Sequence, residues 1–120
     1  SSGRTLCRLD GTVMGPCPLT DQDHFIDTNA MLFGRGSFHL LDQWVLMPTY
    51  GHLIGDRIML HHVKQSGVVR RHLEQGSVFY RCTKEGLYRQ MNEKIPTGVQ
   101  KRPNYEASFQ AWEADGHPPL

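Results

Sequence analysis

Histidine is the first residue type to consider for chemistry, because the chain has seven histidines in 120 residues. Imidazole can ligate a metal or transfer a proton near neutral pH. His62, His72 and Cys82 recur every ten residues, a spacing that would align them across three neighbouring strands as a mixed zinc site. Structural zinc motifs contain ligand pairs at short spacing, and this set has none. We therefore assign no metal ligand and expect no cofactor; hydrogen-bonded histidines are the alternative.

A second pattern centres on adjacent histidines. The run Gly55-Asp56-Arg57-Ile58-Met59-Leu60-His61-His62 resembles the core of a His-metal-finger nuclease. In such a site one histidine activates water and the other holds a divalent metal. The class also needs a further His or Asn from a following helix, and here His72 fits that position only loosely.

Basic residues are concentrated in the second half of the chain. Between Lys64 and Arg102 there are nine Lys or Arg against three Glu, a local balance of +6. Such a stretch can bind nucleic-acid phosphate, with strong salt dependence. Arg70, Arg71, Lys101 and Arg102 are the candidate nucleic-acid-binding residues, and a solvated outer face is the alternative.

The segments that would position these residues have the sequence pattern of β-strands. Six are predicted: two within Phe38–Met47 about a turn at 41–43, then Arg57–Val63, Val68–Leu73, Ser77–Cys82 and Leu87–Met91. Glycine lies in several of the connections, and short strands at regular spacing are typical of a barrel or sandwich. The predicted fold is thus all-β, a small six-stranded antiparallel barrel or sandwich with one short C-terminal helix.

The predicted organisation has three parts. Residues 1–23 are rich in Gly and Pro and are expected to form an N-terminal arm or loop; residues 24–103 form the barrel; residues 104–120 form a short helix and an extended tail. The helix is predicted over Tyr105–Glu113 with Asn104 as its N-cap.

The order of several segments resembles the N-terminal barrel of the chymotrypsin-like main cysteine protease of picornavirus-like plus-strand RNA viruses. The segments are Asn29–Phe33, Gly36–Leu41, Trp44–Pro48, Gly55–Leu60, Glu85–Met91 and Lys94–Arg102. The resemblance implies a general base at His52, an orienting acid at Glu85 and a basic RNA-binding connection at 94–102. In the family the histidine follows the strand-ending proline by two positions, where this chain has Tyr50.

The same resemblance implies an incomplete enzyme. The family's nucleophile lies in a Gly-x-Cys-Gly turn of a second barrel, and this chain contains neither. Cys82 is expected to be a small buried apolar residue, and Cys17, flanked by prolines, to be exposed. The expected partners are viral RNA, the viral polyprotein or a second barrel. An RNA-binding or protein-binding β-domain without catalysis is the alternative.

Composition narrows the broad class. With 38% hydrophobic and 21% charged residues the chain is a globular domain rather than a disordered one. No apolar run approaches the roughly 18 residues of a membrane helix, and no signal peptide is expected. Three cysteines without a C-x-x-C motif favour a reducing compartment, the cytoplasm or the host cytoplasm if the protein is viral. Nothing in the sequence sets the oligomeric state.

Overall fold

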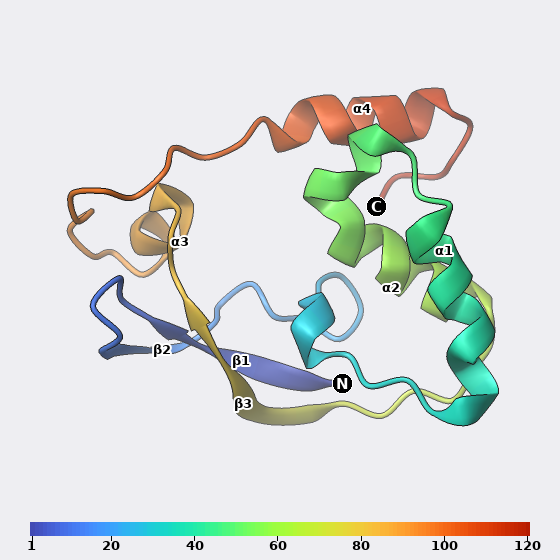
Figure 1. Cartoon of the computed structure of the whole chain (residues 1–120), viewed down its shortest axis with the longest axis horizontal. Helices are drawn as coiled ribbons and strands as arrows, with labels where there is room; N and C mark the ends of the chain where they lie inside the picture. The colour runs from blue at the N-terminus through green and yellow to red at the C-terminus, as the bar shows by residue number, and fades with distance from the viewer.

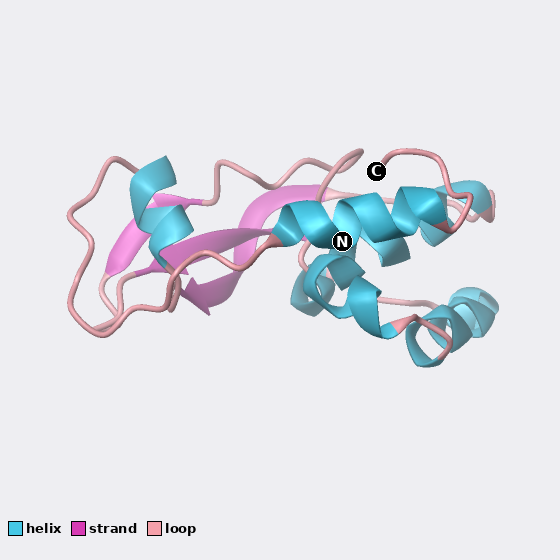
Figure 2. Cartoon of the chain, turned by 90° about the horizontal axis from the view of Figure 1, so that it is seen from above, coloured by secondary structure: helices cyan, strands magenta, loops and turns pink.

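The computed structural model describes residues 1–120 and shows a mixed α/β chain with its sheet toward one end and most of its helices toward the other (Figures 1 and 2). The sheet has three strands, β1 (Ser2–Cys7), β2 (Val13–Pro16) and β3 (Leu73–Arg81), in the order β2-β1-β3. β1 pairs antiparallel with β2 and parallel with β3. The prediction of a six-stranded all-β barrel or sandwich is therefore wrong.

The central strand, β1, lies within the segment that we expected to be an arm or loop. Its pattern is hard to see in the sequence because it contains Arg4, an ordinarily exposed residue type that is buried here. A close approach to β3 explains one glycine: a Cβ at Gly76 would lie 2.3 Å from Thr5 Oγ1. Gly76 therefore lets the β1 and β3 backbones meet at this point.

Three of the segments predicted as strands are helical. The helices are α1 (Asp42–Val45), α2 (Gly55–Gln65), α3 (Glu85–Gln90) and α4 (Tyr105–Ala114), with 3-10 helices η1 (Thr28–Ala30), η2 (Arg35–Leu41) and η3 (Thr49–Ile54). Thus 38–47 forms η2 and α1, 57–63 lies in α2, and 87–91 lies mostly in α3. Val68–Leu73 contributes only Leu73 to a strand.

Burial on several sides of α2 explains the error there. Ile58 packs against Ile54 and Trp112, while Leu60 packs against Ile26 and Ala30. A short helix that is buried on more than one side has a dense apolar run, and such a run cannot be distinguished from a buried strand by periodicity.

Two local predictions are confirmed. β3 includes most of the strand predicted over Ser77–Cys82, and α4 begins at Tyr105 as predicted. Asn104 caps that helix, since its Oδ1 accepts a hydrogen bond from the Ala107 amide at 3.2 Å. Both predictions used local signals, a turn glycine and an N-cap.

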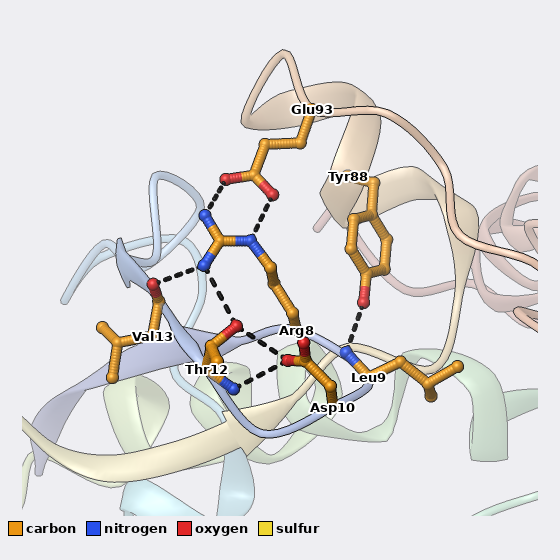
Figure 3. A network of polar contacts seen from close by, with 7 residues as sticks. All are labelled: Arg8, Leu9, Asp10, Thr12, Val13, Tyr88 and Glu93. Atoms are coloured by element: carbon orange, nitrogen blue, oxygen red, sulfur yellow. Dashed lines mark hydrogen bonds and ion pairs between the residues drawn. The ribbon is translucent and has the colours of Figure 1, made fainter.

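A polar network attaches α3 to the turn that joins β1 and β2 (Figure 3). The buried Tyr88 hydroxyl accepts from the Leu9 amide at 2.7 Å and donates to the Cys82 carbonyl at 3.1 Å. The Arg8 guanidinium donates two hydrogen bonds, of 2.7 and 2.9 Å, to the Glu93 carboxylate. These contacts fix α3 at the sheet end of the molecule, where Leu6, Cys17, Cys82 and Tyr88 form a small core. None of the helices has the length and apolar character needed to cross a membrane.

Candidate functional site

A buried ion pair lies between the sheet and the loop before α2. Arg4 of β1 donates from Nη1 to Asp27 Oδ2 at 2.5 Å, and both side chains are only 6% exposed. The Arg4 guanidinium also lies 4.4 Å from the Tyr80 ring centroid and 5.1 Å from that of Phe25. Its Nε donates to Cys17 Sγ at 3.2 Å. The largely buried guanidinium thus has an acidic partner, a thiol partner and two aromatic neighbours.

Asp27 serves a second purpose in addition to pairing with Arg4. Its Oδ1 accepts from the Asn29 amide at 2.9 Å and so caps η1. Two fixed hydrogen bonds hold this carboxylate in one orientation, with one oxygen toward the strand and the other toward the loop.

A second carboxylate, that of Asp56, lies close to this pair. Burial raises the pKa of Asp56, and the negative charge of Asp27 raises it further; Thr28 and the charge of Arg4 act in the opposite direction. Asp56 is also in the first turn of α2, whose positive end favours an anion. Desolvation outweighs these stabilising contacts, so the site holds an acid that keeps its proton more tightly than usual.

The two carboxylates line a cavity of about 430 Å³, which we call the central pocket. It is enclosed by β1, β3 and the segments that carry α2, α3 and α4, the elements around the middle of Figure 1. Its charged lining comprises Arg4, Asp27, Asp56, Arg57, Lys84 and Arg102, and its aromatic lining comprises Phe25, Tyr80, Tyr105 and Phe109. Four cations thus face two carboxylates inside one cavity.

The cations of the central pocket differ in how firmly they are held. The Arg57 guanidinium lies 5.2 Å from the ring centroid of Phe25 and 5.7 Å from that of Phe109, and burial lowers its pKa. Arg102 pairs with Glu106 at 2.9 Å on the exposed side of α4. Lys84 makes no side-chain hydrogen bond or ion pair in the structure, so its ammonium is available to an anion.

Replacing Asp56 with asparagine is expected to stabilise the protein at neutral pH by on the order of 1 kcal/mol. The folded-state pKa of Asp56 is raised, so ionisation costs the folded state more than the unfolded chain. The penalty is absent below the ordinary value of 3.8 and grows as the pH rises through the raised pKa. Urea unfolding at pH 7 and near pH 3.5 measures the difference.

The matched control for that experiment is Asp42→Asn, because Asp42 is an exposed aspartate in the first turn of α1. The Asp42→Asn substitution should not raise the free energy of unfolding at either pH. An Asp56→Asn protein that is less stable than the parent at pH 7 would contradict the account.

The structure separates the two residues assigned to protease chemistry. His52 lies on η3, which packs against α4. Glu85 begins α3 at the other end of the molecule and pairs with Arg89 at 3.6 Å (Figure 1). No hydrogen bond or ion pair joins them, and neither lines the central pocket.

The four candidate nucleic-acid contacts also divide between sites. Arg70 and Arg71 line a different cavity, and Arg70 pairs with Asp23 at 3.4 Å. Lys101 and Arg102 precede α4, and only Arg102 of these two reaches the central pocket. The four therefore do not form one continuous basic stripe.

The histidines and cysteines singled out in the sequence do not gather into a metal site. No group of three or more His, Cys, Asp or Glu side chains has an arrangement that could hold an ion. His61 and His62 lie on α2, and His72 contacts Ser1 Oγ at 3.0 Å. Cys82 is buried as expected, and burial raises the pKa of its thiol to about 11. Cys17 is buried too, contrary to prediction, because Arg4 covers its sulfur.

Sequence reasoning missed the charged residues on the floor of the central pocket. Arg4 falls in the segment predicted as an arm, Asp27 belongs to no predicted site, and Asp56 and Arg57 appear in the nuclease-like and protease-like segments without a role of their own. The one available signal was the adjacent acid and base at 56–57 beside apolar residues.

Comparison of the chain with protein-family models, with curated proteins and with solved structures found no match.

Proposed function

We propose that the central pocket binds a phosphorylated ring compound bearing hydroxyl groups, of the nucleotide or sugar-phosphate class. In this proposal Asp56 accepts a hydrogen bond, and in a reaction a proton, from one of the hydroxyls. The observation that supports it most is the meeting of two carboxylates, one buried and one half-buried, with four cations and four aromatic rings in one cavity.

The cations account for the phosphate. Guanidinium and ammonium groups bind phosphate oxygens through charge-assisted hydrogen bonds, and Arg does so in a planar, two-pronged geometry. Arg4 is committed to Asp27 and Arg102 to Glu106, and Arg57 donates one hydrogen bond to the His24 carbonyl. The cations that remain open to a ligand are therefore Lys84 and the rest of the Arg57 guanidinium. Two such cations suit one phosphate group.

The aromatic side chains account for the ring. Phe25 and Phe109 both lie within 6 Å of the Arg57 guanidinium, and Tyr105 lies 5.0 Å from the Arg102 guanidinium. Aromatic faces bind planar bases by stacking and sugar rings through their apolar faces. A cavity with both features recognises a ligand with a flat or cyclic body and an anionic end.

The two carboxylates account for the hydroxyls. Asp27 is fixed by Arg4 and the η1 cap, so it can orient a ligand but cannot easily move. Asp56 has a raised pKa, and a carboxylate of this kind is a stronger proton acceptor than an ordinary exposed one. Its position beside Asp27 and Thr28 fits the role of a general base toward a ligand hydroxyl.

Calorimetric titration with adenosine monophosphate, glucose 6-phosphate and inorganic phosphate tests this function. We expect saturable binding of at least one of the two ring compounds, and a Kd about tenfold higher in Lys84→Met, which is a loss of about 1.4 kcal/mol. Arg35→Met is the matched control, since Arg35 is an exposed cation on η2 outside the pocket.

The Asp56→Asn variant distinguishes recognition of the ligand's hydroxyl groups from recognition of its phosphate. It should weaken binding of the ring compounds while leaving inorganic phosphate binding unchanged or tighter, because a neighbouring negative charge is removed. Absence of saturable binding by all three probes, or equal effects of Lys84→Met and Arg35→Met, would overturn the assignment.

The barrel on which the protease prediction depended is absent, since the chain forms a three-stranded mixed sheet. Of the basic residues at 101–102, Arg102 lines the central pocket and has both an acidic partner and an aromatic one, whereas Lys101 does not reach the pocket.

A further inference from the structure

Four aromatic rings lie together where α2 meets α4, and we call them the ring cluster. The buried indole of Trp112 stacks on His117, with ring centroids 3.7 Å apart and planes 14° from parallel. The edges of His61 and His62 approach the same indole, with centroids at 5.5 and 6.3 Å. The two imidazoles are 5.4 Å from each other. Three titratable rings thus surround one tryptophan.

The ring cluster holds the segment 116–120 against the helices. Gly116 adopts a φ of 89°, a left-handed conformation that reverses the chain after α4. His117 is thereby returned onto Trp112, whose Nε1 donates to the Pro118 carbonyl at 2.8 Å. Leu120 packs against the core formed by Ile54, Ile58 and Trp112. The attachment therefore depends on the indole and the rings around it.

No carboxylate offsets a positive charge on the cluster. Burial lowers the pKa of His61, and the charges of His117 and Lys64 lower it further. Burial also lowers the pKa of His62, followed by the charges of His61 and His117. The other titratable groups on α2, η3 and α4 are Asp56, Arg57, Tyr50, His52, Tyr105, Glu106, Glu113 and, directly after α4, Asp115. None of them is among the groups that shift the pKa of His61 or His62. Asp115 is bound by the Tyr50 hydroxyl at 2.5 Å.

We propose that the ring cluster is an acid-sensitive latch: neutral imidazoles keep segment 116–120 docked on Trp112, and protonation of His61 and His62 releases it. A cation at either position lies beside two other imidazoles, and Lys64 adds to the repulsion at His61. Since both folded-state pKa values are lowered, the docked state has its full stability above about pH 6.5 and loses it as the pH falls through the lowered values.

Release of segment 116–120 would affect the central pocket through α2 and α4. α2 carries Asp56 and Arg57, and α4 carries Tyr105 and Phe109, so the two helices that the ring cluster joins also supply opposite parts of the pocket lining. The latch itself does not depend on what the pocket binds.

The test uses Trp44→Phe, which leaves Trp112 as the only indole of the two in the chain. Its fluorescence is recorded from pH 8 to pH 5 together with acrylamide quenching and far-UV circular dichroism. We expect a red shift and a several-fold rise in acrylamide quenching below about pH 6.5, with the circular dichroism unchanged. In Trp44→Phe with His61→Gln and His62→Gln, the transition should be absent; the single histidine variants serve if the double variant does not fold.

Three results would overturn the proposal. The first is an emission maximum and an acrylamide quenching constant that do not change between pH 8 and pH 5. A fall in fluorescence intensity without any change in quenching counts as this result. Another is the same transition in the glutamine variants. The third is a concurrent loss of circular dichroism, which would indicate global unfolding rather than release of one segment.

Discussion

Replacing Arg4 with methionine is expected to lower the free energy of unfolding by about 3–5 kcal/mol, because it leaves the Asp27 carboxylate buried without its partner. Both side chains are 6% exposed, so water cannot replace the lost contact. The guanidinium also lies between two aromatic rings and covers Cys17, and a methionine of similar length keeps part of that packing. Urea unfolding monitored by circular dichroism at pH 7 measures the change.

The chain contains a matched control in a second arginine–carboxylate pair near the sheet. Arg8 and Glu93 form a bidentate pair, but their side chains are 39% and 26% exposed. Arg8→Met should therefore cost only about 1 kcal/mol or less. Adding Asp27→Asn to Arg4→Met should recover part of the loss, since the uncompensated charge is then removed. Equal costs for Arg4→Met and Arg8→Met would show that burial does not determine the strength of these pairs.

Replacing Trp112 with alanine is expected to cost about 3–5 kcal/mol, the range for removing a buried large aromatic side chain. Trp112 is 2% exposed and joins Ile54 and Ile58 in the core between η3, α2 and α4. Its loss would leave a cavity and would leave the Pro118 carbonyl without its donor. Because the core of this chain is divided into three small clusters, neighbouring side chains cannot easily fill the space.

Trp44→Ala is the control for Trp112→Ala. Trp44 is 45% exposed on α1, so its removal should change the unfolding free energy by about 1 kcal/mol or less. Thermal unfolding of both variants under one buffer condition makes the comparison. A Trp44→Ala protein as destabilised as Trp112→Ala would mean that the apolar residues of α1 are buried in solution.

Local signals in the sequence were sufficient wherever a structure depends on near neighbours. Asn104 caps α4 because its side chain reaches an amide three residues away, and such a contact can be predicted from type and spacing alone. The strand over 77–81 contains β-branched and aromatic residues, although the glycine before it, Gly76, lies inside β3 rather than in a turn. Cys82 could be expected inside because an unpaired cysteine is among the most buried residue types.

Tertiary structure decided the rest, including the candidate site. Whether Arg4 lies in an arm or in the central strand depends on Asp27, and nothing near Arg4 in the sequence indicates that partner. Whether the run containing His61 and His62 is helix or strand depends on the surfaces that bury both of its sides. The raised pKa of Asp56 likewise arises from burial and from Asp27, a residue of another segment. Composition and periodicity report what a residue type prefers on average. The energy of a buried charge is instead set by pairing between residues far apart in the chain, and only the folded structure shows which residues pair.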